Sequence, residues 1–181
     1  MKTYILLIRG INVGGKNKMA MSVLKKCLEG LGFFDVVTYI ASGNAIIKSD
    51  KTAAAVQAKI EKALPEHFKL DSELIKVLAL PRAQFKGVVA NKPKGFGEQP
   101  TKYHCDVIFL IGITVAKAMS VFSPKEGVDT IWPGKGVIYS QRLSSLRTKS
   151  RLGKIVGTSA YKSMTIRSWN TTVKLLNTLE K

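Results

Sequence analysis

The stretch of the chain best suited to chemistry is a loop rich in glycine, asparagine and basic side chains. It reads Arg9-Gly-Ile-Asn-Val-Gly-Gly-Lys-Asn-Lys18 and lies between an apolar run and a helical pattern. The adjacent residues Gly14 and Gly15 permit a positive backbone φ and close approach of another group. Such a loop can expose backbone N–H groups near the start of a helix, where the helix dipole favours negative charge. The loop therefore predicts a site for an anion, without naming a reaction.

The side chains of this loop suit a phosphate or a carboxylate, although each also has a structural interpretation. The Arg9 guanidinium offers a planar pair of donors that matches such oxyanions, but it could instead pair with Asp35 or with a backbone carbonyl. Asn12 and Asn17 can donate to and accept from a ligand, yet asparagines equally stabilise turns by bonding to nearby backbone. Lys16 follows the glycines without the hydroxyl residue of a nucleoside-triphosphate loop. Both interpretations stay open for every one of these side chains.

Two shorter motifs accompany the loop. Ser42-Gly43-Asn44 reads as a tight turn, and Arg167-Ser-Trp-Asn-Thr171 places a basic group at the start of the last helix, with Ser168 as its N-cap. The N–H groups at that helix end predict a second anion site. Trp169 begins an apolar helical stripe, which is more typical of core packing than of a base-stacking platform. We expect the ligand-binding residues to be Arg9, Asn12, Gly14, Gly15, Lys16, Asn17, Ser42, Gly43, Asn44, Arg167, Asn170 and Thr171.

The usual catalytic and metal-binding patterns are missing from the sequence. His67 and His104 lack the spacing of metal ligands, so surface or core roles are expected for both. Cys27 and Cys105 lie in apolar patterns, which favours buried free thiols over a disulfide or a metal pair. None of the three motifs contains a carboxylate, and nothing beside their lysines or Ser42 would activate a nucleophile. We therefore assign no catalytic residue, metal or cofactor, and leave open whether the protein is an enzyme.

The chain carries a large positive net charge. Its 29 Lys and Arg residues against 12 Asp and Glu give a net charge of +17, and no acidic residue occurs from Thr130 to Leu179. A field of this kind attracts polyanions and weakens with salt, although a lysine-rich surface can also serve solubility alone. The segment Arg147–Lys154 is suited to phosphate contacts, or is a solvated helix face. The basic residues of the acid-free stretch are Lys135, Arg142, Arg147, Lys149, Arg151, Lys154, Lys162, Arg167 and Lys174.

Hydrophobic periodicity predicts the elements that position these motifs. The first part of the chain reads as strand, helix, strand, strand, helix, strand, which packs as a ferredoxin-like sandwich. In that arrangement the first two strands run parallel, so we expect the 9–18 loop and the 42–44 turn to be neighbours. The expected strands are 3–9, 35–41, 45–48 and about 73–80, and the expected helices are 20–31 and one that stops at Pro65.

The same order of elements recurs in the second part of the chain. We expect an α+β fold: a tandem pair of ferredoxin-like (βαββαβ) half-domains, each with an antiparallel sheet and helices on one face. The halves are residues 1–80 and 101–181, joined by a linking helix and loop over 81–100. The elements expected in the second half are strands at 103–111, 128–132, 137–141 and 163–167, with helices at 114–122, 145–156 and from 169.

The motifs at 9–17, 42–44 and 165–171, taken in order and spacing, resemble the bacterial family catalogued as domain of unknown function 1697. In that family the third motif usually reads Thr-x-Arg-Asn-Trp-x-Thr, and Ser168 stands in place of the Asn here. The resemblance covers essentially the whole chain and implies a tandem ferredoxin-like α+β fold. It implies no established activity, substrate or catalytic residue.

Three functions fit these observations. The first, which we favour, is an anion-binding module that contacts nucleic acid, although the expected strands lack the aromatic pattern of common RNA-binding sheets. The second is binding or modification of a small phosphorylated or carboxylated metabolite at the edge formed by the 9–18 and 42–44 loops. The third is a structural role with an acidic protein partner. No apolar run reaches the roughly 20 residues of a membrane span and no signal-peptide pattern is present, so we expect a cytoplasmic protein without a membrane partner. The oligomeric state is not indicated.

Overall fold

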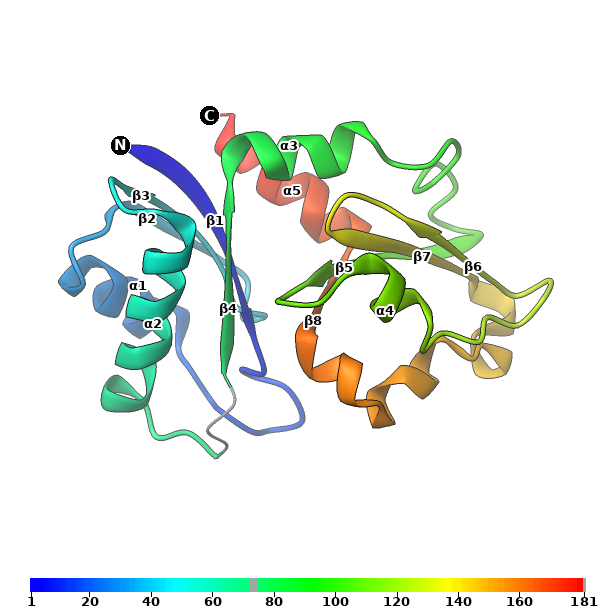
Figure 1. Ribbon diagram of the computed structural model, residues 1–181, viewed down its shortest axis with the longest axis horizontal. Coiled ribbons are helices and arrows are strands. Elements are labelled where there is room, and N and C mark those ends of the chain that lie inside the picture. Colours follow the sequence, from blue (N-terminus) through cyan, green and yellow to red (C-terminus); the bar gives the residue numbers. More distant parts are fainter. Residues whose placement is uncertain (72–74, 181) are drawn as a thin grey trace. The chain divides into compact units, whose positions relative to one another are not determined.

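The computed structural model describes residues 1–71 and 75–180. The chain forms two compact units, Met1–Phe85 and Lys86–Lys181, and each is built on a four-stranded antiparallel sheet (Figure 1). The division falls within one helix, α3 (Arg82–Ala90). The predicted α+β class with two sheet-containing halves is confirmed.

The first unit orders its strands β2-β3-β1-β4, with every neighbouring pair antiparallel. Figure 1 shows both of its helices on one face of this sheet. Tyr4, Leu6 and Ile8 of the central strand turn to the helices and pack with apolar residues that recur at helical spacing. The elements are β1 (Lys2–Arg9), α1 (Met21–Gly30), β2 (Phe34–Tyr39), β3 (Asn44–Ser49), α2 (Ala53–His67) and β4 (Lys76–Pro81).

Two details of the first unit differ from the sequence prediction. The helix expected to stop at Pro65 continues to His67. Because Pro65 lies in the last turn, its missing N–H removes a single helical hydrogen bond, and the turn survives. The strand expected from about 73 begins at Lys76, and positions 73 and 74 lie outside the described residues.

The second unit orders its strands β6-β7-β5-β8, again with antiparallel neighbours. One face of this sheet carries an aromatic cluster, in which the Phe96 ring meets Tyr139 and Trp169 edge to face with ring centroids 5.3 Å apart. The elements are β5 (Tyr103–Leu110), α4 (Val115–Met119), β6 (Asp129–Pro133), β7 (Val137–Leu143), β8 (Met164–Ser168) and α5 (Trp169–Leu179).

The prediction of a helix at 145–156 is wrong. In its place the chain makes three 3-10 helices, Ser144–Lys149, Leu152–Gly157 and Ser159–Ser163, separated by extended backbone at Ser150 and Thr158. Ser and Thr compete with helical bonds, and glycines weaken a helix interior. Asp129 adds a tertiary cause, because its carboxylate accepts a hydrogen bond from the Arg151 backbone N–H at 2.8 Å. One face of the second sheet is therefore covered by short turns instead of a long helix.

Candidate functional site

The glycine pair of the 9–18 loop forms the tip of a small hairpin. Val13 and Lys16 form an isolated bridge, and the Lys16 N–H donates to the Val13 carbonyl oxygen at 3.1 Å. Gly14 and Gly15 between them have φ of 60° and 76°, as a two-residue hairpin turn with positive φ at both central positions requires. A Cβ added at either glycine would meet no atom within 4 Å. The tip is therefore open, and turn geometry alone explains its glycines.

Asn12 holds the base of this hairpin. Its side-chain Nδ2 donates to the carbonyl oxygens of Met19 and Ala41, at 2.9 and 2.8 Å. Its Oδ1 accepts from the Met19 backbone N–H at 2.8 Å. The backbone at Asn12 has a φ of 54°, in the left-handed region that asparagine tolerates. The amide of Asn12 is therefore committed to the fold.

Asn17 is buried, with 3% of its surface exposed, and forms a second set of backbone contacts. Its Nδ2 donates to the Gly10 carbonyl oxygen at 2.7 Å, and its Oδ1 accepts from the Asp71 N–H at 2.7 Å. The Asn17 N–H in turn donates to the Asp71 carboxylate at 2.6 Å. Of the two interpretations that the sequence left open for Asn12 and Asn17, these contacts favour turn stabilisation.

The 42–44 turn lies against the end of β1. The Ile8 N–H donates to the Gly43 carbonyl oxygen at 2.7 Å, and a Cβ added at Gly43 would come within 2.7 Å of the Ile8 carbonyl oxygen. The buried Asn44 donates through Nδ2 to the Tyr39 carbonyl oxygen at 3.1 Å and to the Ser42 hydroxyl at 2.9 Å. Together with the bond from Asn12 to Ala41, these contacts confirm that the two loops are neighbours.

The remaining groups at this edge are few. Arg9 is half-buried at the end of β1, whereas Lys16 and Ser42 are exposed. The side-chain amides of Asn12 and Asn17 bond to backbone groups, and that of Asn44 bonds to the Tyr39 carbonyl oxygen and the Ser42 hydroxyl. Lys18 is also exposed, the Ser42 hydroxyl already accepts from Asn44, and the hairpin tip is open.

The third motif is split between core and surface. Arg167 lies in β8 with 7% of its surface exposed, and its guanidinium donates to the Thr165 hydroxyl at 2.9 Å and to the Ile166 carbonyl oxygen at 2.8 Å. Burial lowers the pKa of Arg167 to about 10. Ser168 caps α5, since its hydroxyl accepts from the Thr171 N–H at 3.2 Å, as predicted. Asn170 is exposed, whereas Thr171 is half-buried and its hydroxyl lies 2.9 Å from that of Ser168.

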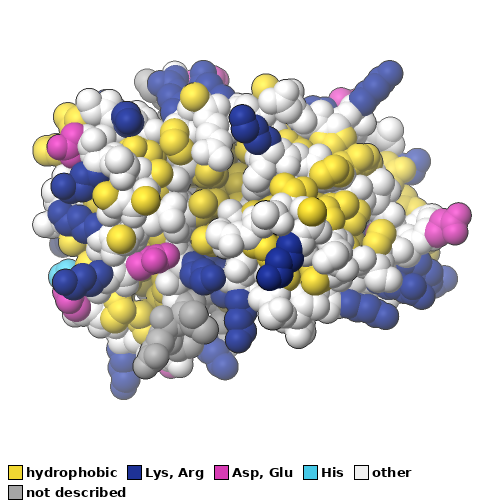
Figure 2. All heavy atoms as spheres, viewed as in Figure 1, with side chains coloured by type: hydrophobic (Ala, Val, Ile, Leu, Met, Phe, Trp, Pro, Cys, Tyr) yellow, Lys and Arg dark blue, Asp and Glu magenta, His cyan; other side chains and the backbone are white. Residues whose placement is uncertain are grey.

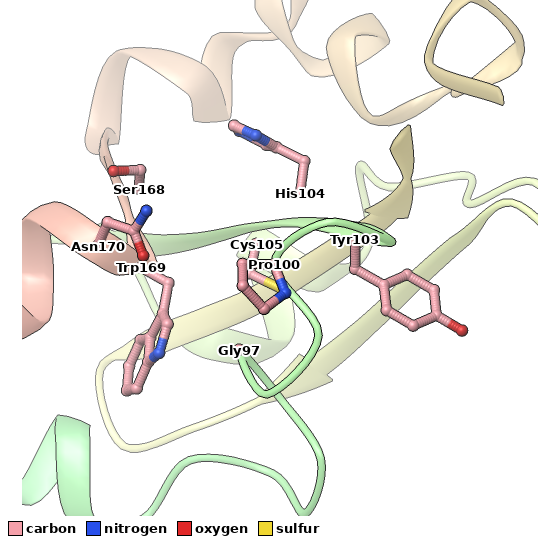
Figure 3. A pocket seen from close by; sticks show the side chains of 8 residues that line it. All are labelled: Gly97, Pro100, Tyr103, His104, Cys105, Ser168, Trp169 and Asn170. Atoms are coloured by element: carbon pink, nitrogen blue, oxygen red, sulfur yellow. The ribbon is translucent and has the colours of Figure 1, made fainter. Parts of the chain in front are cut away.

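A small pocket forms where this motif meets the start of β5 (Figure 3). Its volume is about 90 Å³, the space of a few water molecules. In Figure 3 the His104 ring points away from the side of β5 on which Trp169 and Gly97 lie. The lining residues are Gly97, Pro100, Tyr103, His104, Cys105, Ser168, Trp169 and Asn170.

A larger cavity, of about 270 Å³, lies on the face of the second sheet that the 3-10 helices cover. Sequence reasoning missed it. Alternate residues of a strand share a face, which puts His104, Asp106 and Ile108 of β5 on the cavity side. Arg142 stands directly across from His104 in the strand register and lines the same cavity. The 3-10 helices contribute Leu152, Gly153, Ile155, Val156 and Tyr161 to the lining.

The polar groups of this cavity form one cluster. His104 Nε2 lies 3.1 Å from Asp106 Oδ1, and an Arg142 terminal nitrogen lies 3.8 Å from Asp106 Oδ2. Burial raises the pKa of the Asp106 carboxyl, and the charges of His104, Arg142 and Arg147 partly offset that rise. The Nε of Arg142 is buried and has no hydrogen-bond partner within the described residues. The cavity therefore offers a carboxyl and a guanidinium side by side.

A signal for this cluster was present in the sequence. The pattern His104-x-Asp106 alternates within an expected strand, and Arg142 follows the expected end of another. The two strands become a site only through their register, which pairs His104 with Arg142. The hairpin across Pro133–Gly136 pairs Arg142 with Asp129 instead, so the register of β5 against β7 could not be read from that turn.

The 3-10 helices also carry a run of exposed cations. We call residues 144–163 the basic segment, because five of its side chains are exposed cations and none is acidic. None of the five forms an ion pair within residues 1–71 and 75–180. Figure 2 shows more Lys and Arg than Asp and Glu side chains on the visible face of the molecule. The exposed cations of the basic segment are Arg147, Lys149, Arg151, Lys154 and Lys162.

Two further findings concern the described residues. No group of three or more His, Cys, Asp and Glu side chains among them could hold a metal ion. None of the described helices is long and apolar enough to cross a membrane. Cys27 and Cys105 are both free and buried, as predicted, and burial raises the pKa of each thiol.

Comparison with known proteins finds a family and a structure of similar fold, and neither brings a stated activity. A family model described as a protein of unknown function (DUF1697) matches residues 1–139. No curated protein matches the chain significantly. Among solved structures, a conserved bacterial protein from Streptococcus pneumoniae is 27% identical with a TM-score of 0.83, over 100% of this chain and 99% of that chain. The similarity spans both units.

Proposed function

Since the chain belongs to the DUF1697 family of proteins of unknown function, membership brings no activity with it, and we propose from the second unit's surface that the protein binds nucleic acid. Contacts between exposed cations and backbone phosphates would supply the affinity. The observation that carries the proposal is the basic segment, with five exposed cations in 20 consecutive residues and no acidic neighbour in sequence from Thr130 to Leu179.

The form of the basic segment supports phosphate binding better than a solubilising role. A solubilising surface spreads its charge and mixes signs, whereas these cations follow one another along a chain of short turns. The serine and threonine residues between them add hydroxyl donors, and these groups commonly contact phosphates. Asp129 holds the backbone of the segment at the Arg151 N–H, and its carboxylate also accepts from the Lys125 N–H outside the segment.

The alternative site, at the 9–18 and 42–44 loops, is less well supported. Recognition of a small metabolite needs several convergent polar groups. Asn12, Asn17 and Asn44 make their contacts with the fold itself. Neither of the two pockets described above is lined by these loops.

We also propose that both units are variants of the ferredoxin-like βαββαβ fold, joined through residues 81–100. The strand orders β2-β3-β1-β4 and β6-β7-β5-β8 follow one connection pattern, which supports this assignment. In the second unit the 3-10 helices would then stand where the first unit has α2. On this proposal the basic segment replaces a helix and reshapes one sheet face for binding.

The test is binding of labelled RNA and DNA oligonucleotides, single- and double-stranded, measured by fluorescence anisotropy at low salt. One variant removes three charges of the basic segment: Lys149→Gln, Arg151→Gln and Lys154→Gln. We expect its affinity to fall by about tenfold or more, because each lost phosphate contact weakens binding.

A matched variant removes three exposed charges of the first unit: Lys26→Gln, Lys62→Gln and Lys69→Gln. It has the same net charge as the first variant, so it controls for non-specific attraction. We expect it to bind nearly as well as the parent protein. Equal losses in both variants, or no binding by the parent protein at about 50 mM salt, would refute the proposal.

A further inference from the structure

We propose that the cavity beneath the basic segment takes one unpaired nucleobase of the bound strand, with guanine preferred. This inference rests on the proposed function, because the basic segment would hold the backbone of that strand. It assigns to His104, Asp106 and Arg142 a role in choosing the base, in addition to the phosphate contacts of the surface.

The size and lining of the cavity fit a single base. Its volume of about 270 Å³ lies just below the roughly 300–1,000 Å³ of pockets for drug-sized ligands, so a fragment the size of one base suits it better than a dinucleotide. Phe122 and Tyr161 bring aromatic rings to the lining, and unpaired bases commonly stack on such rings. Val156 and Ile166 remain 59% and 37% exposed, which leaves apolar surface for a base to cover.

The polar cluster matches the edge of guanine. The carboxyl of Asp106 and the guanidinium of Arg142 lie side by side, with 3.8 Å between Asp106 Oδ2 and a terminal nitrogen of Arg142. Guanine presents its O6 acceptor beside the N1–H and N2–H donors, so Arg142 can donate to O6 while Asp106 accepts from the two N–H groups. Within the described residues, His104 contacts Asp106 Oδ1, and the Arg142 nitrogen lies beyond hydrogen-bond distance of Oδ2, which leaves Oδ2 as an acceptor for guanine.

A free anion fits the cavity less well. A phosphate entering it would meet the Asp106 carboxyl next to Arg142, and burial strengthens that repulsion. A neutral base carries both donors and acceptors, so it satisfies both side chains at once.

The cavity also adjoins the surface that would hold the backbone. Leu152, Gly153, Ile155 and Val156 line the cavity, and the exposed cations Arg151 and Lys154 lie between or beside them in the chain. The charge of Arg147 acts on Asp106. A strand lying on the basic segment therefore has a base within reach of the opening.

The experiment compares short oligouridines that carry one central guanine, adenine, cytosine or uracil, each titrated by anisotropy with the full chain. We expect the guanine oligonucleotide to bind about 5- to 100-fold more tightly than the uracil reference, as one well-formed bidentate contact provides. Asp106→Asn replaces an acceptor by a donor and should remove that preference. Val156→Trp should remove it too, because the indole fills the cavity from an exposed position and leaves every charge in place.

Lys149→Gln is the matched control, since this exposed side chain is outside the lining. It should weaken all four oligonucleotides equally and keep the preference. Equal binding of the four by the parent protein, with affinity that still falls with salt, would overturn the base pocket and leave the proposed function standing. Failure of all four to bind would overturn both, and a preference that survives Val156→Trp would place the selectivity elsewhere.

Discussion

Gly43→Ala tests how the second motif is built, because two structural terms add at this position. The backbone φ of Gly43 is 79°, and a non-glycine residue there costs about 1–2 kcal/mol. The new Cβ would also lie 2.7 Å from the Ile8 carbonyl oxygen, a backbone atom that cannot simply rotate away. Relief of that contact shifts the turn and weakens the 2.7 Å hydrogen bond from the Ile8 N–H to Gly43, worth about 0.5–1.5 kcal/mol. The free energy of unfolding should fall by about 1.5–3.5 kcal/mol.

Gly15→Ala is the matched control for this prediction. Its φ of 76° is nearly the same, but a Cβ there meets nothing within 4 Å. Only the backbone cost of about 1–2 kcal/mol applies. Both variants are compared with the parent protein by urea unfolding followed by far-UV circular dichroism. Equal losses in the two variants would refute the reasoning, because the approach of Ile8 would then contribute nothing.

Three further predictions rest on hydrogen bonds, pKa shifts and burial in the structure. Asn12→Ala removes three side-chain hydrogen bonds and should lower the free energy of unfolding by about 2–4 kcal/mol. Asn170 is exposed, so Asn170→Ala should change it by less than about 0.5 kcal/mol. Similar losses for the two variants in urea titrations would be inconsistent with a structural role for Asn12. For Asp129, burial would raise the pKa, but hydrogen bonds from Ser150 and two backbone N–H groups lower it below 3.8, so its stabilisation is present above pH 3.8 and is lost as the pH falls through the folded pKa. Asp106 has the opposite sign: its folded pKa is raised above 3.8, so its ionisation costs stability as the pH rises from 3.8 through the folded value. Asp129→Asn should therefore lower the free energy of unfolding more above pH 3.8 than below it. Asp106→Asn should become more stable relative to the parent protein as the pH rises from 3.8. Unfolding curves at a series of pH values that show the same trend for both variants would contradict this. The two buried cysteine thiols should react slowly with a thiol reagent in the native protein and fast in denaturant, and rapid native labelling would argue against their burial.

Local periodicity was sufficient to predict most of the fold. The apolar run of β1 and the i, i+3, i+4, i+7 spacing of α1 each match one backbone geometry, so both elements lie close to their expected residues. The segment 145–156 failed because its outcome depends on tertiary contacts. Asp129 draws the Arg151 N–H away from a helical partner, and no local pattern contains that bond.

The candidate site divides in the same way. The adjacency of the 9–18 and 42–44 loops followed from strand direction, which topology dictates. The role of Asn12 could not be predicted in this way, because its partner Ala41 is 29 positions away and is brought to it by the turn that contains Gly43. The His104, Asp106 and Arg142 cluster depends on strand register, and a shift by one residue would send Arg142 to the other face.

The salt dependence of nucleic-acid binding tests the central claim most directly. The logarithm of the binding constant is measured against the logarithm of salt concentration for the parent protein and for the variant with Lys149→Gln, Arg151→Gln and Lys154→Gln. Each phosphate contact to a single strand contributes about 0.7 to the slope, so loss of three contacts should make it shallower by about 2. That change, absent from the matched first-unit variant, is the result predicted for phosphate contacts along the basic segment. Parallel lines for the parent protein and the basic-segment variant would contradict it.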